Sequence, residues 1–372
     1  MGGNAFSQGD DALSTPRMPP ELYFQLKREY QEVLRQFYNE IRCPHEVPHK
    51  PDHGDLDFLV AGLKHGCVRE DVAVGLRAER WTKTHPTVSY AVPLAGTHDQ
   101  YVQVDVLECP PDMLDWEVFM KSYGDLLQIL GHTLRNLGLT ANDKGFYVRV
   151  PEIEARSQKE SMLLLTNNPD KAMAFLGLDA NKWHGRSTAG QGPAGFTSVE
   201  DIFEWCTSGR FFSLEFLNDK RDKSNDRRRL KQRSMFASFL NDWLPAHPEV
   251  GAQGLKWTRQ EILELALSAF DKQKEYEKMM HLHDIMLRED ALWEKVLKRW
   301  VQFENGKPEL RREADMNDEN RRPWASMIDE EDQEGLVSWV QENWEKAKDK
   351  EKSRVSQPKR ERREGVKAVS LA

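Results

Sequence analysis

The feature that most constrains the fold is a six-residue apolar run interrupted by two acids. Residues 55–60 read DLDFLV, and a segment with three prolines and a glycine leads into them. Because proline ends the helical pattern before it, the run is predicted to be a short strand. Residues two apart on a strand share a face, about 6.7 Å apart along the chain. Asp55 and Asp57 are therefore expected side by side, with the apolar side chains between them facing the core.

A third acid stands on a later strand that shows the same alternation. Residues 87–92 and 101–107 read as strands, joined by a connection that contains Gly and Asp. In the second of these strands the valines share one face, whereas Gln103 and Asp105 share the other. If this strand lies beside the first acidic strand, Asp105 completes a set of three carboxylates.

These three carboxylates predict a metal site. Neighbouring carboxylates repel each other unless a cation neutralises them, and Mg²⁺ suits them because it prefers oxygen ligands and leaves room for substrate phosphates. Three such acids can hold two ions about 3.5 to 4 Å apart for in-line phosphoryl transfer. We expect Asp55 and Asp57 to bind both ions, and Asp105 to activate the nucleophile.

The rest of the chain reads as predominantly helical, to judge from apolar spacing and from helix caps. Residues 168–170, Ser198 with Asp201, and Thr258 with Glu261 have the composition of helix starts. Apolar spacing predicts three helices, at residues 20–41, 68–80 and 114–138. It also predicts one further strand, at residues 145–150. Residues 258–304 are expected to be helical throughout.

The acidic strand and its surroundings resemble a known superfamily. The run His53-Gly54-Asp55-Leu56-Asp57-Phe58-Leu59-Val60, followed by Asp105, is similar to the nucleotidyltransferases to which DNA polymerase beta belongs. It is most similar to uncharacterised fungal and phage members with a Gly-Asp-Leu-Asp strand. The resemblance implies transfer of a nucleoside monophosphate from a nucleoside triphosphate to a hydroxyl, with Mg²⁺ or Mn²⁺ as cofactor. The acceptor is a nucleic acid, a protein or a small molecule.

Members of this superfamily also carry a Gly-Gly or Gly-Ser turn that binds the triphosphate. The candidate turn here is Gly2-Gly3-Asn4, some fifty residues before the acids and separated from them by the helix predicted at residues 20–41. The chain order of turn, helix and acidic strand is kept. The resemblance therefore implies that Gly2, Gly3 and Asn4, together with Gly54, contact the nucleotide.

Together, pattern and resemblance predict an α+β fold followed by helices. Residues 1–150 are expected to form a nucleotidyltransferase-like mixed sheet with flanking helices. Residues 151–304 are expected to form an α-helical domain. Residues 305–372 read as a charged connector, a short helix and a disordered tail.

Charge leaves a second interpretation open. The formal net charge of −8 does not indicate a general nucleic-acid binder. Yet residues 219–233 hold eight Lys and Arg against three Asp, and residues 346–367 hold ten against four acids. Such local patches contact phosphates even in an acidic protein. The alternative is a catalytically inactive nucleotidyltransferase-like module that binds RNA or a protein partner, with residues 227–229 as candidate contacts. A structural protein with solvated strand acids is a further alternative.

Several isolated side chains are weaker candidates. Lys121 and Lys144 flank the helix after Asp105, and Arg149 lies on the next predicted strand, so any of them could contact triphosphate or acceptor. Each is more often an ordinary surface charge. His53, beside the acids, could orient a phosphate but is more often a plain loop residue.

The remaining composition bears on the cellular setting. No apolar run approaches 18 residues, so a membrane span is not expected. The N-terminus lacks the basic start and apolar core of a secretory signal, and the four cysteines are too widely spaced for a Cys-x-x-Cys pair. We expect an intracellular protein with reduced thiols, in the cytoplasm or the nucleus.

Overall fold

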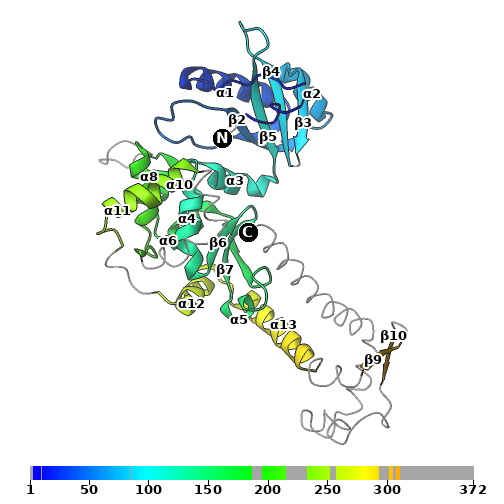
Figure 1. The fold of residues 1–372 in the computed structure, drawn as a ribbon, viewed down its shortest axis with the longest axis vertical. Coiled ribbons are helices and arrows are strands. Elements are labelled where there is room, and N and C mark those ends of the chain that lie inside the picture. The colour runs from blue at the N-terminus through cyan, green and yellow to red at the C-terminus, as the bar shows by residue number, and fades with distance from the viewer. Residues whose placement is uncertain are drawn as a thin grey trace, which may run out of the picture. The chain divides into compact units, whose positions relative to one another are not determined.

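The computed structural model describes most of the first three quarters of the chain and two short strands beyond it (Figure 1). The chain divides into two compact units, Met1–Tyr276 and Glu277–Ala372. Several predicted features lie outside the described residues: Gly2, residues 227–229, and the predicted short helix and tail. Of the two basic runs, only Arg233 is described. The described residues are 3–9, 11–84, 86–186, 195–214, 233–251, 257–292, 301–304 and 307–310.

A mixed five-stranded sheet forms the centre of the N-terminal half, with strand order β1-β2-β5-β4-β3. The strands β2 and β5 run parallel, and every other neighbouring pair is antiparallel. Strands 55–60, 87–92 and 101–107 were predicted, and all three are present. The strands are β1 (Tyr38–Arg42), β2 (Asp55–Leu63), β3 (Arg80–Thr84), β4 (Thr87–Pro93) and β5 (Tyr101–Glu108).

Two helices, α1 (Pro20–Leu34) and α2 (Arg69–Leu76), bury the apolar face of this sheet. Leu56, Phe58 and Val60 of β2 are completely buried, as the alternation of the acidic strand predicted. They pack with the valines of β5 and with aromatic residues of α1 in one apolar core. The acids of β2 and β5 are therefore left on the opposite face of the sheet.

A second, three-stranded antiparallel sheet follows, with strand order β6-β7-β8. Its strands are β6 (Leu139–Asn142), β7 (Gly145–Arg149) and β8 (Met162–Thr166). Only β7 was predicted, and β8 falls inside the region expected to be α-helical. The chain as described is thus a mixed α+β protein. The boundary proposed at residue 150 stays a prediction.

Helices account for most of the remaining described residues. The three caps are confirmed, because Asn168, Ser198 and Thr258 each accept a hydrogen bond from a backbone N–H of the first turn. Among these residues, no helix combines the length and the apolar character needed to cross a membrane. The helices are η1 (Pro111–Met113), α3 (Leu114–Lys121), α4 (Leu126–Leu134), η2 (Arg135–Leu137), α5 (Pro151–Glu154), α6 (Pro169–Leu176), α7 (Ala180–His184), α8 (Val199–Thr207), α10 (Ser234–Ser238), η5 (Phe239–Trp243), α11 (Leu244–Ala246), α12 (Arg259–Phe270) and α13 (Gln273–Leu292).

Three helix predictions were too long. The helix predicted at residues 20–41 ends at Leu34, and its last part is β1, which pairs antiparallel with β2. The helix predicted at 68–80 ends at Leu76, and Arg80 begins the edge strand β3. Residues 258–304 are interrupted at Asp271, whose positive φ ends α12, and they finish in β9 (Val301–Glu304), paired with β10 (Lys307–Leu310).

The helix predicted at residues 114–138 is also broken, and this break shapes the site. Tyr123 and Gly124 both have positive φ, at 57° and 62°, so α3 and α4 cannot be continuous. The Tyr123 N–H donates to the carbonyl of His45, and the N–H of His45 donates to Ser122 Oγ. The interruption therefore ties this turn to the segment that leads into β2.

Candidate active site

The three predicted acids lie on one face of the first sheet. The parallel register sets Asp57 directly opposite Asp105, and the antiparallel register sets Asp105 opposite Ser89 of β4. One row of the sheet thus reads Asp57, Asp105, Ser89. In the row before it, Asp55 is opposite Gln103. The expectation that the two acidic strands are neighbours is confirmed.

The N-terminal segment lies on this same polar face. The Gly3 N–H donates to Asp55 Oδ2 at 3.0 Å, and the N–H of Ala5 donates to Gln103 Oε1 at 2.9 Å. Thr15 Oγ1 donates to the Gly3 carbonyl at 2.6 Å, which closes the segment into a loop. Fifty residues of chain separate the glycine turn from the acids, yet the fold places its Gly3 in contact with them.

Gly3 itself is required for this approach. Its φ is +83°, which only glycine adopts without strain, and a Cβ there would lie 2.5 Å from the carbonyl oxygen of Gly54. Two of the residues implied as nucleotide contacts, Gly3 and Gly54, are thus packed against each other. Asn4 is exposed next to them, and its carbonyl accepts hydrogen bonds from Ser7.

Asp105 is held by two polar neighbours. The Gln103 amide donates to both carboxylate oxygens at 3.0 Å, and the Ser89 side chain adds a further hydrogen bond. Burial raises the pKa of Asp105, the Ser89 hydrogen bond opposes this rise, and the nearby charge of Asp55 adds to it. A carboxylate with a raised pKa is a better proton acceptor, which suits it to a general base.

Asp57 has the most perturbed carboxyl group in the site. Its side chain reaches solvent in the cleft, but the surrounding protein desolvates the carboxyl. That desolvation, followed by repulsion from Asp55 and Asp105, raises its pKa from 3.8 to about 7. Lys121 partly offsets the rise. Without a neutralising cation, a large share of Asp57 is therefore protonated near neutral pH.

A cleft of about 760 Å³ opens beside these residues. Asp55, Asp57 and Gly54 line it, as does Lys121, which was a weak candidate from the sequence. Most other lining residues are charged or belong to the segment before β2 and to the turn after α3, and the rest come from α8 and α10. They include Arg17, Glu46, Lys50, Gly124 and Asp125.

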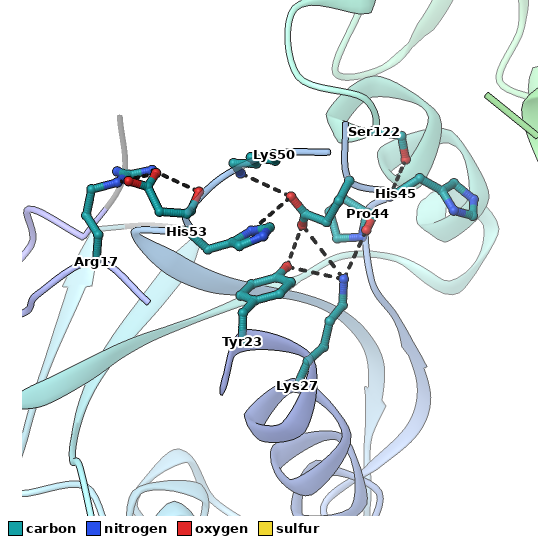
Figure 2. Close-up of polar contacts among 10 residues, drawn as sticks. Arg17, Tyr23, Lys27, Pro44, His45, Lys50, His53 and Ser122 are labelled. Atoms are coloured by element: carbon teal, nitrogen blue, oxygen red, sulfur yellow. Dashed lines mark hydrogen bonds and ion pairs between the residues drawn. The ribbon is translucent and has the colours of Figure 1, made fainter. Parts of the chain in front are cut away.

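Glu46 is the centre of a polar cluster that holds the segment before β2. Tyr23 of α1 and Lys50 donate hydrogen bonds to its carboxylate, Lys27 pairs with it at 3.8 Å, and His53 Nδ1 lies 3.4 Å away (Figure 2). The ring of His53 stacks on Tyr23 with 3.7 Å between centroids. The cluster joins α1 to His53, two residues before Asp55, and so positions the start of β2.

Three weaker candidates do not line the cleft. His53 is buried, 2% exposed, in the Glu46 cluster. Arg149 is also buried and pairs with Glu154 at 2.6 Å. Lys144 lies in the exposed turn between β6 and β7, where its N–H donates to Asn142 Oδ1. Only Lys121 of the candidate cations lines the cleft.

The functional neighbours that sequence reasoning missed are polar residues on the same face. Gln103 stood in the pattern, because it alternates with Asp105 on the polar face of β5. Ser89 showed no signal, since its role depends on how β4 pairs with β5. Glu46 and Lys50 lie in a proline-rich segment whose path no local pattern predicts.

The acids fit a divalent cation by chemistry, because such an ion prefers carboxylate oxygens. In the described part of the chain, no three His, Cys, Asp or Glu side chains meet as a metal-binding group. Asp55 instead accepts the hydrogen bond from Gly3. Desolvation, followed by repulsion from Asp55 and Asp105, raises the pKa of Asp57, and a hard cation relieves that repulsion.

Comparisons with known proteins give a weak structural likeness. No protein-family model matches the chain, and no curated protein sequence matches it significantly. Among solved structures, it is similar to the crystal structure of Leishmania infantum polymerase beta in a ternary P/T complex, at 12% identity and a TM-score of 0.35. That match covers 46% of this chain and 77% of the other. A likeness this distant carries no functional argument, so the proposal below rests on the site.

Proposed function

We propose that this protein transfers a nucleoside monophosphate from a nucleoside triphosphate to a hydroxyl acceptor, in a nucleotidyltransferase-like site. The observation that carries the proposal is the row of Asp57, Asp105 and Ser89, with Asp55 beside it and Lys121 in the same cleft. Three acids on one sheet face cost stability unless a cation or bound protons neutralise them. The narrower resemblance to fungal and phage proteins stays a prediction.

In the proposed reaction, Asp105 accepts the proton of the attacking hydroxyl. The hydroxyl oxygen bonds to the α-phosphorus, and the bond to the bridging oxygen breaks, so that pyrophosphate leaves with the electron pair. Gln103 and Ser89 keep the Asp105 carboxylate oriented toward the acceptor. Lys121 and the N–H groups of the Gly3 turn are suited to bind the phosphates.

Asp55 and Asp57, with Asp105, are the residues that would hold Mg²⁺ or Mn²⁺. When bound, the ion neutralises these acids and stabilises charge that develops on the transferring phosphate. If Asp55 exchanges its hydrogen bond with Gly3 for the ion, the Gly3 N–H becomes free for a phosphate oxygen, so that loading of the site would couple the two groups.

The inactive module is the second candidate, and one observation favours it. The described residues contain no group of three possible metal ligands that already meet, as would suit a site that has lost its chemistry. On that alternative, RNA binding is independent of the acids. The same experiment decides between the two.

The test is thermal stability of the full chain with each nucleoside triphosphate, with and without Mg²⁺ or Mn²⁺. We expect one triphosphate to stabilise the protein only when the ion is present, by about 2.7 kcal/mol at a hundredfold excess over Kd. The Asp55→Asn/Asp57→Asn variant should show no such shift. Asp115→Asn, which removes an exposed acid of α3, is the matched control and should behave as wild type. Equal shifts in all three proteins would refute the proposed site.

Catalysis is tested with an α-labelled triphosphate, by transfer of label and release of pyrophosphate. Asp105→Asn should reduce turnover on the order of 10³-fold, because the base is lost. Stabilisation by the triphosphate should largely persist in this variant, because Asp55 and Asp57 would still bind both ions. Donor binding without any transfer to RNA, to small alcohols or to protein hydroxyls would favour the inactive module.

A further inference from the structure

A second cavity, of about 880 Å³, shares a wall with the cleft of the acids. Residues 44–51 line both spaces, so a ligand in the second cavity is separated from the acids by one segment of chain. That segment is fixed from two sides. Glu46 ties it to α1, and the backbone of His45 ties it to the turn between α3 and α4 (Figure 2).

Aromatic rings form much of the lining of this second cavity. Phe24 of α1 lines it and is 47% exposed, so its ring is open to a ligand. His45 stacks on Tyr123 with 5.2 Å between centroids and 13° between planes, and Phe196 meets Tyr123 edge-on. Such a lining suits a flat, aromatic ligand.

The charge of the cavity favours an anion. Among the described lining residues, Glu46 is the single carboxylate, and Tyr23, Lys27 and Lys50 already satisfy it. Lys27 is further committed to Tyr23 Oη and to the Pro44 carbonyl, both at 3.3 Å. Lys50 has a side chain that is 38% exposed, and it lines both this cavity and the cleft. Lys50 can therefore contact a phosphate beside the aromatic rings.

We propose that the second cavity binds the acceptor, and that the acceptor is a nucleotide with a free ribose hydroxyl. Its base stacks against Phe24, and its phosphate pairs with Lys50 at the segment between the two spaces. Calling this ligand the acceptor rests on the proposed function, whereas its binding in the second cavity does not depend on that function. A free mononucleotide and the 3′ end of a nucleic acid present the same chemistry here.

The test measures binding of a short fluorescein-labelled single-stranded RNA to the full chain by fluorescence polarisation, without triphosphate. Phe24→Ala should weaken binding about tenfold, the loss expected for one stacked base. Trp81→Ala, which removes a 39% exposed aromatic from the edge strand β3, is the matched control and should bind like wild type. Lys50→Gln should weaken binding and reduce its dependence on salt by about one phosphate contact.

Competition identifies the source of the nucleotide, and the acid variants separate this inference from the proposed function. If a mononucleotide displaces the RNA at similar concentration, the acceptor is a free nucleotide; if only RNA competes, it is a nucleic-acid end.

Asp55→Asn/Asp57→Asn should bind RNA normally, even if no transfer is ever detected. Wild-type affinity in Phe24→Ala, with circular dichroism confirming its fold, would overturn the inference, as would no RNA or mononucleotide binding by wild type.

Discussion

At the residue scale, the site depends on contacts that involve single atoms of the chain. Gly3 has no side chain, and this is what allows its N–H to reach Asp55 while its Cα lies against Gly54. Asp57 and Asp105 are adjacent across two parallel strands, so each carboxyl changes the proton affinity of the site. Both features lead to predictions that a single substitution can test.

Gly3→Ala is expected to abolish stabilisation by metal and triphosphate while lowering the melting temperature of the free protein by only a few degrees. The added Cβ would collide with the Gly54 carbonyl and push the turn away from Asp55. Gly9→Ala is a close control, because Gly9 also has positive φ, +92°, but has no atom within 4 Å of the added Cβ. Both variants carry a backbone strain of about 1 kcal/mol. Identical ligand shifts in the two would contradict the role of Gly3.

Asp57→Asn is expected to change how stability depends on pH in metal-free buffer. A carboxyl whose pKa is higher in the folded state stabilises the fold while protonated, and this contribution is lost as pH rises from about 4 through about 7. Wild type should therefore lose stability across that window relative to the asparagine variant. Urea unfolding at pH values on both sides of the window measures the difference. Parallel pH profiles would mean that the Asp57 pKa is not raised.

At the element scale, short polar contacts join the second sheet to the helices beside it. Arg149 of β7 pairs with Glu154 of α5, and it donates to the carbonyl of Arg135 in η2. Glu154 in turn pairs with Arg259, the first residue of α12. Four elements thus meet in one partly buried cluster, well apart in sequence from the acids.

Arg149→Ala is expected to destabilise the protein by about 3 kcal/mol, the lower end for breaking a buried ion pair, because Glu154 keeps Arg259 as a partner. Urea unfolding measures the free energy. Lys144→Ala, in the exposed turn at the other end of the β6–β7 hairpin, should change it by less than about 0.5 kcal/mol. If Arg149→Ala were as stable as Lys144→Ala yet lost donor binding, Arg149 would belong to the site after all.

At the scale of the whole molecule, every described residue of the cleft and of the second cavity lies in the first compact unit, Met1–Tyr276. A chain shortened to end at Leu292, the last residue of α13, should therefore melt cooperatively and keep the ligand-dependent shift of the full chain. Differential scanning calorimetry of the two proteins measures this. Loss of the shift in the shortened protein alone would show that residues beyond α13 complete the site.

The sequence by itself determined the local features. These are the strands at residues 55–60, 87–92 and 101–107, the faces that these strands bury, and the caps at Asn168, Ser198 and Thr258. These follow from side-chain periodicity and from hydrogen bonds between residues close in the chain. Helix ends were predicted less well, because Tyr38–Arg42 and Arg80–Thr84 become strands only by pairing with strands elsewhere in the sheet.

Tertiary structure alone decided how the site is assembled. Asp57 and Asp105 meet because β2 and β5 pair in parallel, a register set by packing of α1 and α2 on the opposite face. Gly3 reaches Asp55 across fifty residues, and the break at Tyr123 brings Lys121 and residues 44–51 to one cleft. Contacts between segments so distant in sequence depend on the packed core, which no local pattern encodes.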